Sequence, residues 1–278
     1  MSKETALMTT MTAPPARPER RGGGLAGTIA SEWTKLWSVR STWWCLAGTA
    51  ALMVLFAAAM SYPPENTAGI PRSALLLPVQ EPAIGALVLA QFALIALAVL
   101  MITAEYATGS IRSTLQWDPR RGRVLLAKVA VLALVVLVAG AAVGALGAVT
   151  ADLVAGEYAV FVLADVAAAA ARTGLYLAVA AIFAVGIGTA IRSTAGALTT
   201  VFMLLLLMPY VVSLPESALL QTIAHYLPGY PGMKFVGMAD FLGIEGLPYD
   251  PVGGLLIFAA WTVAAVLTGY AVLRLRDA

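Results

Sequence analysis

Six long runs without a charged side chain constrain this chain more than any other feature of its sequence. The hydrocarbon core of a bilayer needs about 20 apolar residues in helical form. The six runs are residues 43–60, 83–104, 129–151, 174–190, 195–214 and 252–273. Hydrophobic residues make up 60% of the chain and charged residues 12%, which excludes a soluble enzyme on a single anchor. We therefore predict an all-α membrane protein with six transmembrane helices.

The region ahead of the first run divides into two parts. Residues 1–24 carry prolines and glycines among polar and basic residues, so we predict a disordered cytoplasmic tail before one membrane domain, 25–278. Four apolar residues then recur at helical spacing: Leu25, Ile29, Trp33 and Leu36. This pattern predicts an N-terminal amphipathic helix that lies in the membrane interface.

Lysine and arginine residues are distributed unevenly between the two sides that six spans define. Both termini fall on one side, which carries ten basic residues near the span ends even without the distant tail. The other side carries three: Arg72, Arg172 and Lys234. Because basic residues concentrate on the cytoplasmic side of membrane proteins, we predict that both termini are cytoplasmic.

The segment 216–251, before the last run, is too apolar for a plain aqueous loop. Pro228 and Pro231 divide it into pieces too short to span a bilayer. We predict an outer segment that dips into the membrane, and the alternative is a loop packed over the helical bundle. In the first case three tyrosines lie near the lipid headgroups: Tyr226, Tyr230 and Tyr249.

Several kinds of chemistry have no residues to support them. None of the six runs contains an ionisable residue of the kind that proton- or ion-coupled carriers keep in their spans. Gln91, the strongest polar group there, is expected to bond a neighbouring helix or the backbone. The motifs of a phosphate-binding loop and of a serine nucleophile are both missing, so we predict no catalytic residues.

Metal and nucleic-acid binding are also disfavoured. Cys45 and His225 are the single cysteine and histidine, which leaves no pair for a disulfide or for a zinc motif. The formal charge of +2 arises from a near balance of basic and acidic residues, which argues against a nucleic-acid partner. In the third run, Gly140 and Gly144 are four residues apart and predict close helix packing, within the chain or against another subunit.

The connection between the second and third runs is the most informative segment. Glu105 lies where the uncharged sequence ends, and Gly109 is expected to break the long helix. Ser110 then caps a short helix that carries Arg112 into the cytoplasm. The alternative is a basic loop that fixes topology and touches lipid headgroups.

These motifs, taken in order, resemble the ABC-2-type transporter permease, the membrane-spanning subunit of a bacterial ATP-binding-cassette transporter. The resemblance covers the chain from about residue 25 and rests on short motifs in a characteristic order. They are E-W-T-K-L at 32–36, S-T-W-W at 41–44, E-Y-x-x-G-S-I-R at 105–112 and the following P-R-x-x-R at 119–123. The outer connections are short, so the large extracellular domain of some members is absent.

The resemblance implies two kinds of partner. Permeases of this family dimerise, here with a second copy or a related permease, and a separate cytosolic ATPase dimer carries ATP and magnesium. The ATPase docks on the interfacial helix and on the short helix after the second span. Carried to this chain, the resemblance assigns ATPase docking and coupling to five residues: Glu32, Lys35, Glu105, Gly109 and Arg112.

The expected function is therefore that of a permease subunit of an exporter in the bacterial plasma membrane. The chain itself is expected to be neither an enzyme nor a cofactor-binding protein. Uncharged, apolar and aromatic spans suggest a lipophilic or amphiphilic cargo. Two alternatives remain open: a membrane scaffold or regulatory subunit that transports nothing, and an autonomous channel or secondary carrier.

Overall fold

The computed structural model describes residues 24–63, 69–117, 120–214 and 217–275. The predicted tail, 1–24, lies outside the described residues except for its last residue. In the described part, six helical segments are long and apolar enough to cross a membrane. They are α2 (Arg40–Met60), α4 (Gln80–Ala107), α6 (Arg121–Ala155), α7 (Leu163–Ile191), the consecutive α8, η2 and α9 (Thr194–Ser213), and α13 (Pro251–Leu275). The predicted fold class, all-α with six membrane-length helices, is confirmed.

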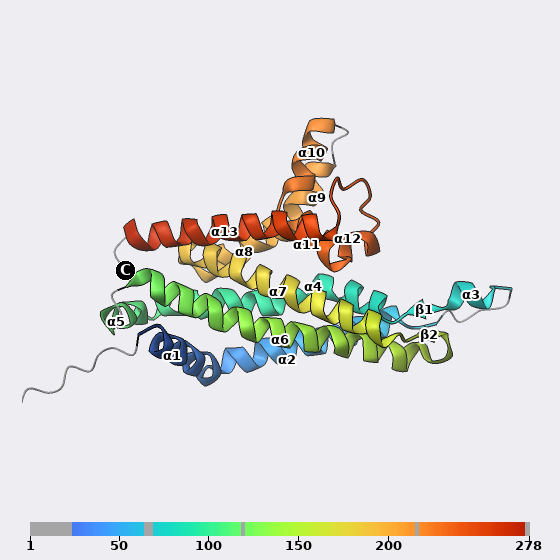
Figure 1. The fold of residues 1–278 in the computed structure, drawn as a ribbon, viewed down its shortest axis with the longest axis horizontal. Helices are drawn as coiled ribbons and strands as arrows, with labels where there is room; N and C mark the ends of the chain where they lie inside the picture. The colour runs from blue at the N-terminus through green and yellow to red at the C-terminus, as the bar shows by residue number, and fades with distance from the viewer. Residues whose placement is uncertain (1–23, 64–68, 118–119, 215–216, 276–278) are drawn as a thin grey trace, which may run out of the picture.

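Shorter elements lie at the two ends of these helices. They are α1 (Gly24–Ser38), α3 (Arg72–Leu75), β1 (Leu77–Pro78), α5 (Ser110–Trp117), η1 (Gly156–Tyr158), β2 (Ala159–Val160), α10 (Ala218–Tyr226), α11 (Gly229–Val236) and α12 (Met238–Phe241). Figure 1 shows α1, α5 and the last turn of α13 at one end of the bundle. We call this the basic end, because Lys35, Arg120 and Arg274 lie there with other basic residues. At the opposite end β1 and β2 pair in parallel, Leu77 beside Ala159.

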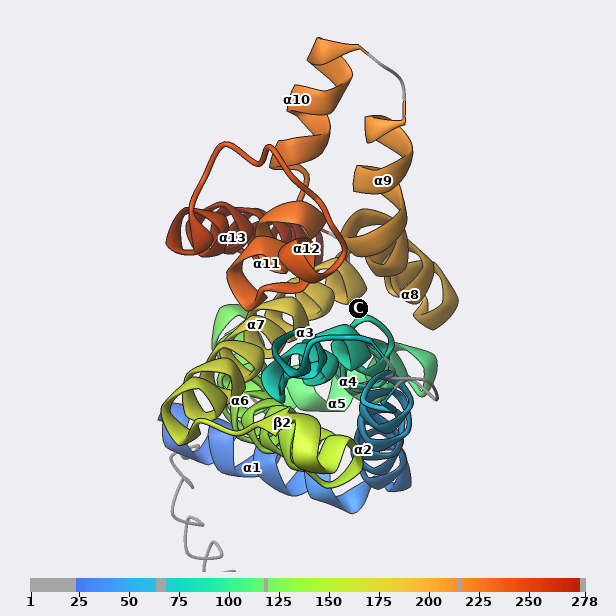
Figure 2. The same ribbon diagram turned by 90° about the vertical axis from the view of Figure 1, so that its right-hand side faces the viewer.

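The first helix, α1, lies across the bundle at its basic end (Figure 2). Its buried face contains Leu36 and, unexpectedly, Glu32, whereas Leu25 and Trp33 are exposed. Trp33 packs edge-on against Trp37, which in turn contacts Trp43. Exposed tryptophans at a helix junction are typical of the membrane–water boundary, which agrees with the predicted interfacial helix.

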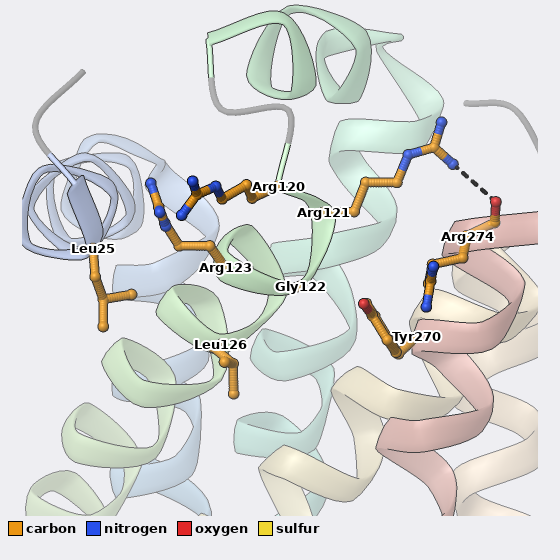
Figure 3. Close-up of a pocket in the computed structure, with 8 residues that line it drawn as sticks. All are labelled: Leu25, Arg120, Arg121, Gly122, Arg123, Leu126, Tyr270 and Arg274. Atoms are coloured by element: carbon orange, nitrogen blue, oxygen red, sulfur yellow. Dashed lines mark hydrogen bonds between the residues drawn. The ribbon is translucent and has the colours of Figure 1, made fainter. Parts of the chain in front are cut away.

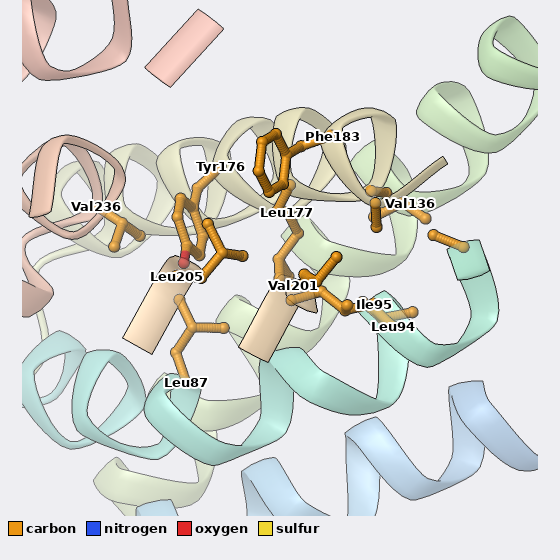
Figure 4. Packing of buried hydrophobic residues seen from close by; sticks show 14 of the residues in the cluster. Leu87, Leu94, Ile95, Val136, Tyr176, Leu177, Phe183, Val201, Leu205 and Val236 are labelled. Carbon is orange, nitrogen blue, oxygen red and sulfur yellow. The ribbon is translucent and has the colours of Figure 1, made fainter. Parts of the chain in front are cut away.

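The core of the bundle lies around α4 and α7, where Leu87, Leu94 and Phe183 are almost completely buried (Figure 4). The peripheral helices α2 and α13 expose most of their apolar side chains instead, including Leu55 and Leu256. Exposure of such apolar surfaces to water would be unfavourable, whereas their contact with lipid carries no free-energy penalty. The distribution of apolar residues therefore fits a bundle whose outer helices contact lipid.

The two predicted packing glycines lie between α6 and α7. A β-carbon on Gly140 would be 2.9 Å from Leu177 Cδ1, and one on Gly144 would be 3.1 Å from Thr173 Cβ. From the other side, a β-carbon on Gly174 would lie 2.5 Å from the carbonyl oxygen of Leu137. The structure thus uses this face for packing within the chain, the first of the two roles considered above.

The fifth span is not a regular α-helix along its length. Between α8 (Thr194–Phe202) and α9 (Met208–Ser213) the turn widens into a π-helix, η2 (Met203–Leu207). Pro209 has no N–H group to donate to the carbonyl of Leu205 four residues earlier, and its ring pushes that carbonyl away. Beyond this point α9 and α10 stand apart from the other helices (Figures 1 and 2).

The segment before the last span folds back onto the bundle. Nearly all of α11 is buried, and it packs against α13 and α7. Tyr230 is only 5% exposed, and its hydroxyl lies 3.0 Å from Ser213 Oγ, so its side chain is packed inside the protein. Tyr226 and Tyr249 instead lie near the surface with their rings 6.0 Å apart. The packing of α11 against α7 and α13 is compatible with the predicted membrane-dipping segment and with the alternative of a segment packed over the bundle.

The long helices extend beyond the predicted spans. The second predicted span ends at 104, but α4 continues to Ala107 and includes Glu105. The third begins at 129, but α6 starts at Arg121 and includes Lys128. The six runs themselves carry no charged residue, but the helices that contain the second and third runs carry one just beyond each run. A helix can continue through a charged residue when an opposite charge is in reach, and Glu105 and Lys128 provide that charge for one another.

Candidate functional site

Four charged side chains from three helices meet at the basic end of the bundle. We call Glu32, Lys35, Glu105 and Lys128 the charge cluster. Glu32 and Lys35 lie on one face of α1 because they are three residues apart, Glu105 lies in the last turn of α4, and Lys128 lies two turns into α6. Two carboxylates and two ammonium groups give the cluster no net charge.

The ion pairs of the cluster are short. Lys128 Nζ lies 2.5 Å from Glu32 Oε2 and 3.0 Å from Glu105 Oε1. Lys35 Nζ lies 2.7 Å from Glu32 Oε1 and 3.0 Å from the same Glu105 oxygen. Each lysine therefore bridges the same two carboxylates, and α1 is tied by charge to both α4 and α6.

Lys35 also reaches a fourth element. Its ammonium group donates to Thr114 Oγ1 of α5 at 3.2 Å, in addition to Glu32 and Glu105. The cross-helix ion pair with Glu105 and this hydrogen bond come from one side chain that is 38% exposed. Lys35 is therefore the point at which the interfacial helix, the second span and the short helix after it are joined.

Burial makes the cluster sensitive to the loss of any one charge. The side chains of Glu32 and Lys128 are each 1% exposed, and that of Glu105 is 11% exposed. Burial alone would raise the pKa of Glu32, but the charges and hydrogen bonds of Lys128 and Lys35 outweigh burial and hold it below the ordinary 4.5. Burial would likewise lower the pKa of Lys35, but Glu32 and Glu105 hold it above 10.5. Glu32 and Lys35 are thus charged at neutral pH.

One oxygen of the cluster has no hydrogen-bond partner among the described residues. Glu105 Oε2 is buried, whereas Glu105 Oε1 accepts from both lysines. A buried carboxylate oxygen without a donor costs free energy. Glu105 is therefore the least completely satisfied member of the cluster.

The structure separates the five predicted docking residues into two groups. Glu32, Lys35 and Glu105 come together, but Glu32 and Glu105 are buried and do not present their side chains to an outside partner. Gly109 and Arg112 are exposed. The docking and coupling role of the five residues stays a prediction, and the burial of Glu32 and Glu105 favours a part in positioning α1 and α5 within it.

Lys128 is the cluster member that the sequence interpretation missed. Its place near a span end marks it only as one of the basic residues that indicate orientation. A usable signal exists: Lys128 lies among apolar residues seven positions after Arg121, two turns into any helix that begins there. A lysine in that setting needs a carboxylate partner.

The connection from α4 to α5 follows the prediction closely. Gly109 has a φ of +70°, a conformation that L-residues with side chains rarely adopt, and it lies between the two helices. Ile111 is buried and anchors α5, while Arg112 is exposed on it. Ser110 is the first residue of α5, and its hydroxyl lies 2.9 Å from Thr108 Oγ1.

Arginines from two other helices bond the last carbonyl groups of α13. Arg121 Nη1 donates to Leu273 O at 2.5 Å, and Arg192 Nη2 donates to Val272 O at 3.3 Å. Arg192 also stacks over Tyr106, 5.0 Å from the ring centroid. The last carbonyls of a helix lack intrahelical partners and carry partial negative charge, so cations are favourable there. These contacts join the basic ends of α6, α7 and α13.

A polar pair lies within the bundle, away from its ends. Tyr176 OH donates to Gln91 Oε1 at 2.5 Å, and Gln91 Nε2 donates to the carbonyl of Val88 at 3.0 Å. The pair joins α4 to α7, and both side chains are buried. The expectation that Gln91 bonds a neighbouring helix and the backbone is confirmed.

The described residues show no cluster of three or more histidine, cysteine, aspartate or glutamate side chains that could hold a metal ion. The arrangement at the basic end is instead that of a mechanical junction, in which paired charges fix the relative positions of helices. No known family model matches the chain, and no curated protein matches it significantly.

Proposed function

We propose that this chain is the membrane-spanning permease subunit of an ATP-binding-cassette exporter in a bacterial plasma membrane. In this proposal a second copy or a related permease completes the translocation path, and a separate cytosolic ATPase dimer supplies the energy. The basic end faces the cytoplasm, in accord with the ten-to-three distribution of basic residues near the span ends. The cargo is lipophilic or amphiphilic.

The observation that carries the proposal is the set of contacts made by Lys35. The resemblance assigns ATPase docking to the interfacial helix and to the short helix after the second span, which are α1 and α5. Lys35 of α1 contacts Glu105 at the end of α4 and Thr114 of α5. A force applied to either docking element is therefore passed directly to a spanning helix.

Affinity purification tests the partnership first. The full chain, extracted in mild detergent, should co-purify with a soluble chain that contains a phosphate-binding loop. Added to liposomes that hold the permease, that chain should hydrolyse ATP faster than it does in empty liposomes. Co-purification with an unrelated membrane complex, and no ATPase, would favour the scaffold alternative.

Coupling is tested by Lys35→Met, which removes the ammonium group and keeps most of the side-chain volume. We expect the variant to insert in the membrane and bind the ATPase, while permease-dependent stimulation of ATP hydrolysis falls at least about tenfold. Lys234→Met is the matched control, because Lys234 pairs with Asp240 in a different part of the chain. Equal stimulation by wild type and Lys35→Met would contradict the coupling role.

Orientation is tested independently with topology reporters. A reporter fused after Arg121 should report the cytoplasm, and one fused after Asp240 should report the outside. An outside signal at Arg121 would place α5 away from a cytosolic ATPase and would overturn the proposal.

The position of Glu105 favours a second candidate function, a proton-coupled carrier. Its carboxylate lies in a membrane-length helix beside Lys128 and has one buried oxygen without a partner among the described residues. Buried acids of this kind can take part in proton relays. Purified permease alone in liposomes distinguishes the two: accumulation of a lipophilic dye under an imposed pH gradient, without ATP, would favour the carrier, and its abolition by Glu105→Gln would assign the proton site.

A further inference from the structure

A hollow with a volume of about 590 Å³ opens at the basic end, between α1, the start of α6 and the end of α13 (Figure 3). It is separate from the charge cluster. Four arginines line it: Arg120, Arg121, Arg123 and Arg274. The other lining side chains are apolar or aromatic: Leu25, Leu126 and Tyr270. Among the described lining residues four are cationic and none is acidic.

One residue that lines the hollow, Gly122, has no side chain. Gly122 lies between Arg121 and Arg123 at the start of α6, and a β-carbon there would be 3.2 Å from the ring of Tyr270. Arg274 lies over the same ring, 5.7 Å from its centroid. Arg121 is held by the carbonyls of Leu273 and Arg274. One wall of the hollow is thus fixed by contacts between α6 and α13.

The hollow continues into an apolar surface on one side. Leu126, one turn further along α6, is 63% exposed, and Leu134, two turns beyond it, is 55% exposed. On α13, Leu267 and Val263 are 60% and 57% exposed. Positive charge at the end of the helices therefore gives way directly to exposed aliphatic side chains along them.

We propose that this hollow binds the headgroup of an anionic phospholipid, with the arginines around its phosphate and the acyl chains along the exposed faces of α6 and α13. Guanidinium groups bind phosphate oxygens with charge-assisted hydrogen bonds, often two at a time. A soluble anion would use the arginines alone, whereas a phospholipid also uses the aliphatic surface next to them. A basic pocket between spanning helices, at the level of the headgroups, has the chemistry that anionic lipids select.

The test measures lipid binding by the purified, delipidated full chain with native mass spectrometry. Phosphatidylglycerol is titrated against phosphatidylcholine, which has the same acyl chains and no net charge. Each arginine near an anionic headgroup contributes roughly 1 kcal/mol. Arg120→Gln/Arg123→Gln should therefore weaken binding of phosphatidylglycerol about 30-fold, at 1.4 kcal/mol for each tenfold, and leave binding of phosphatidylcholine unchanged.

The matched control is Arg72→Gln/Arg172→Gln, which removes the same charge from exposed residues near the opposite end. It should reduce phosphatidylglycerol binding less than threefold. Arg274→Gln is a second variant, because it leaves the start of α6 intact, and it should weaken binding about fivefold. Three results would each overturn the proposal: equal affinity of wild type for the two lipids, equal losses in the test and control variants, or inorganic phosphate displacing the lipid at comparable concentration.

Discussion

Replacement of Lys128 by methionine should destabilise the protein more than almost any other loss of a single charge. Lys128 Nζ contacts Glu32 Oε2 at 2.5 Å, Glu105 Oε1 at 3.0 Å and the carbonyl of Met101 at 3.3 Å. The variant keeps the side-chain volume but leaves two buried carboxylates to share Lys35. Removing one partner of a buried ion pair typically costs about 3–5 kcal/mol, because the remaining charge stays buried without compensation.

Thermal unfolding in detergent measures this loss. With roughly 2–4 °C per kcal/mol for a chain of this size, Lys128→Met should lower the unfolding midpoint by about 6–20 °C. Lys234→Met is the control, since the partner of Lys234, Asp240, is 61% exposed. That surface pair is screened by water and contributes at most about 1 kcal/mol.

A double variant separates lost charge from lost packing. Lys128→Met leaves the cluster with one excess negative charge, and adding Glu32→Gln returns it to neutrality. The double variant should therefore be more stable than Lys128→Met alone, by about 1–3 kcal/mol. Two results would refute this role of Lys128: an unfolding midpoint of Lys128→Met equal to that of the Lys234→Met control, or additive destabilisation by the two substitutions at the cluster.

Two further predictions concern pH and packing. Because the pKa of Glu32 is lowered below 4.5 and that of Lys35 is raised above 10.5, the stability lost in Lys35→Met should be constant from about pH 5.5 to 9.5. This loss of stability should shrink as the pH falls through the folded-state pKa of Glu32 and its carboxylate is protonated. It should also shrink as the pH rises through the folded-state pKa of Lys35 and its ammonium group is deprotonated. A change near pH 7 in the difference between the thermal midpoints of wild type and variant would contradict this. Gly174→Ala should lower the midpoint by several degrees because its β-carbon would lie 2.5 Å from Leu137 O, whereas Gly48→Ala, with no atom within 4 Å, should be neutral or stabilising.

The spans were predictable because each depends on a local property. An uncharged apolar run needs no knowledge of its neighbours to be recognised, and Gly109 ends α4 through its own backbone conformation. The interfacial helix was likewise visible in its spacing. Its buried face was not, because burial of Glu32 depends on Lys128, which lies 96 residues further along the chain.

The charge cluster shows why the site was only partly predictable. Three of its members were identified by resemblance to a family, but no pattern within α1 indicates that its glutamate faces inward. The place of α11 was hidden for a similar reason. Gly232 lets α11 approach Tyr176 and Phe258, and these contacts exist only once α7 and α13 are in place. Long-range partners, rather than local propensity, decide both features.

The pairing of β1 with β2 has a consequence for the freedom of the bundle. These two strands join the connection before α4 to the connection before α7, with Val79 N donating to Val160 O at 3.3 Å. Near the other end the charge cluster joins α4 to α6 through the ion pair of Glu105 and Lys128. The second span, α4, is thus held near both ends, by the strand pair at one end and by the charge cluster at the other. The fifth span has a π-helical turn in its middle, and its last part stands apart from the other spans (Figure 1). If the chain is the proposed permease, we expect the largest displacements of its transport cycle there.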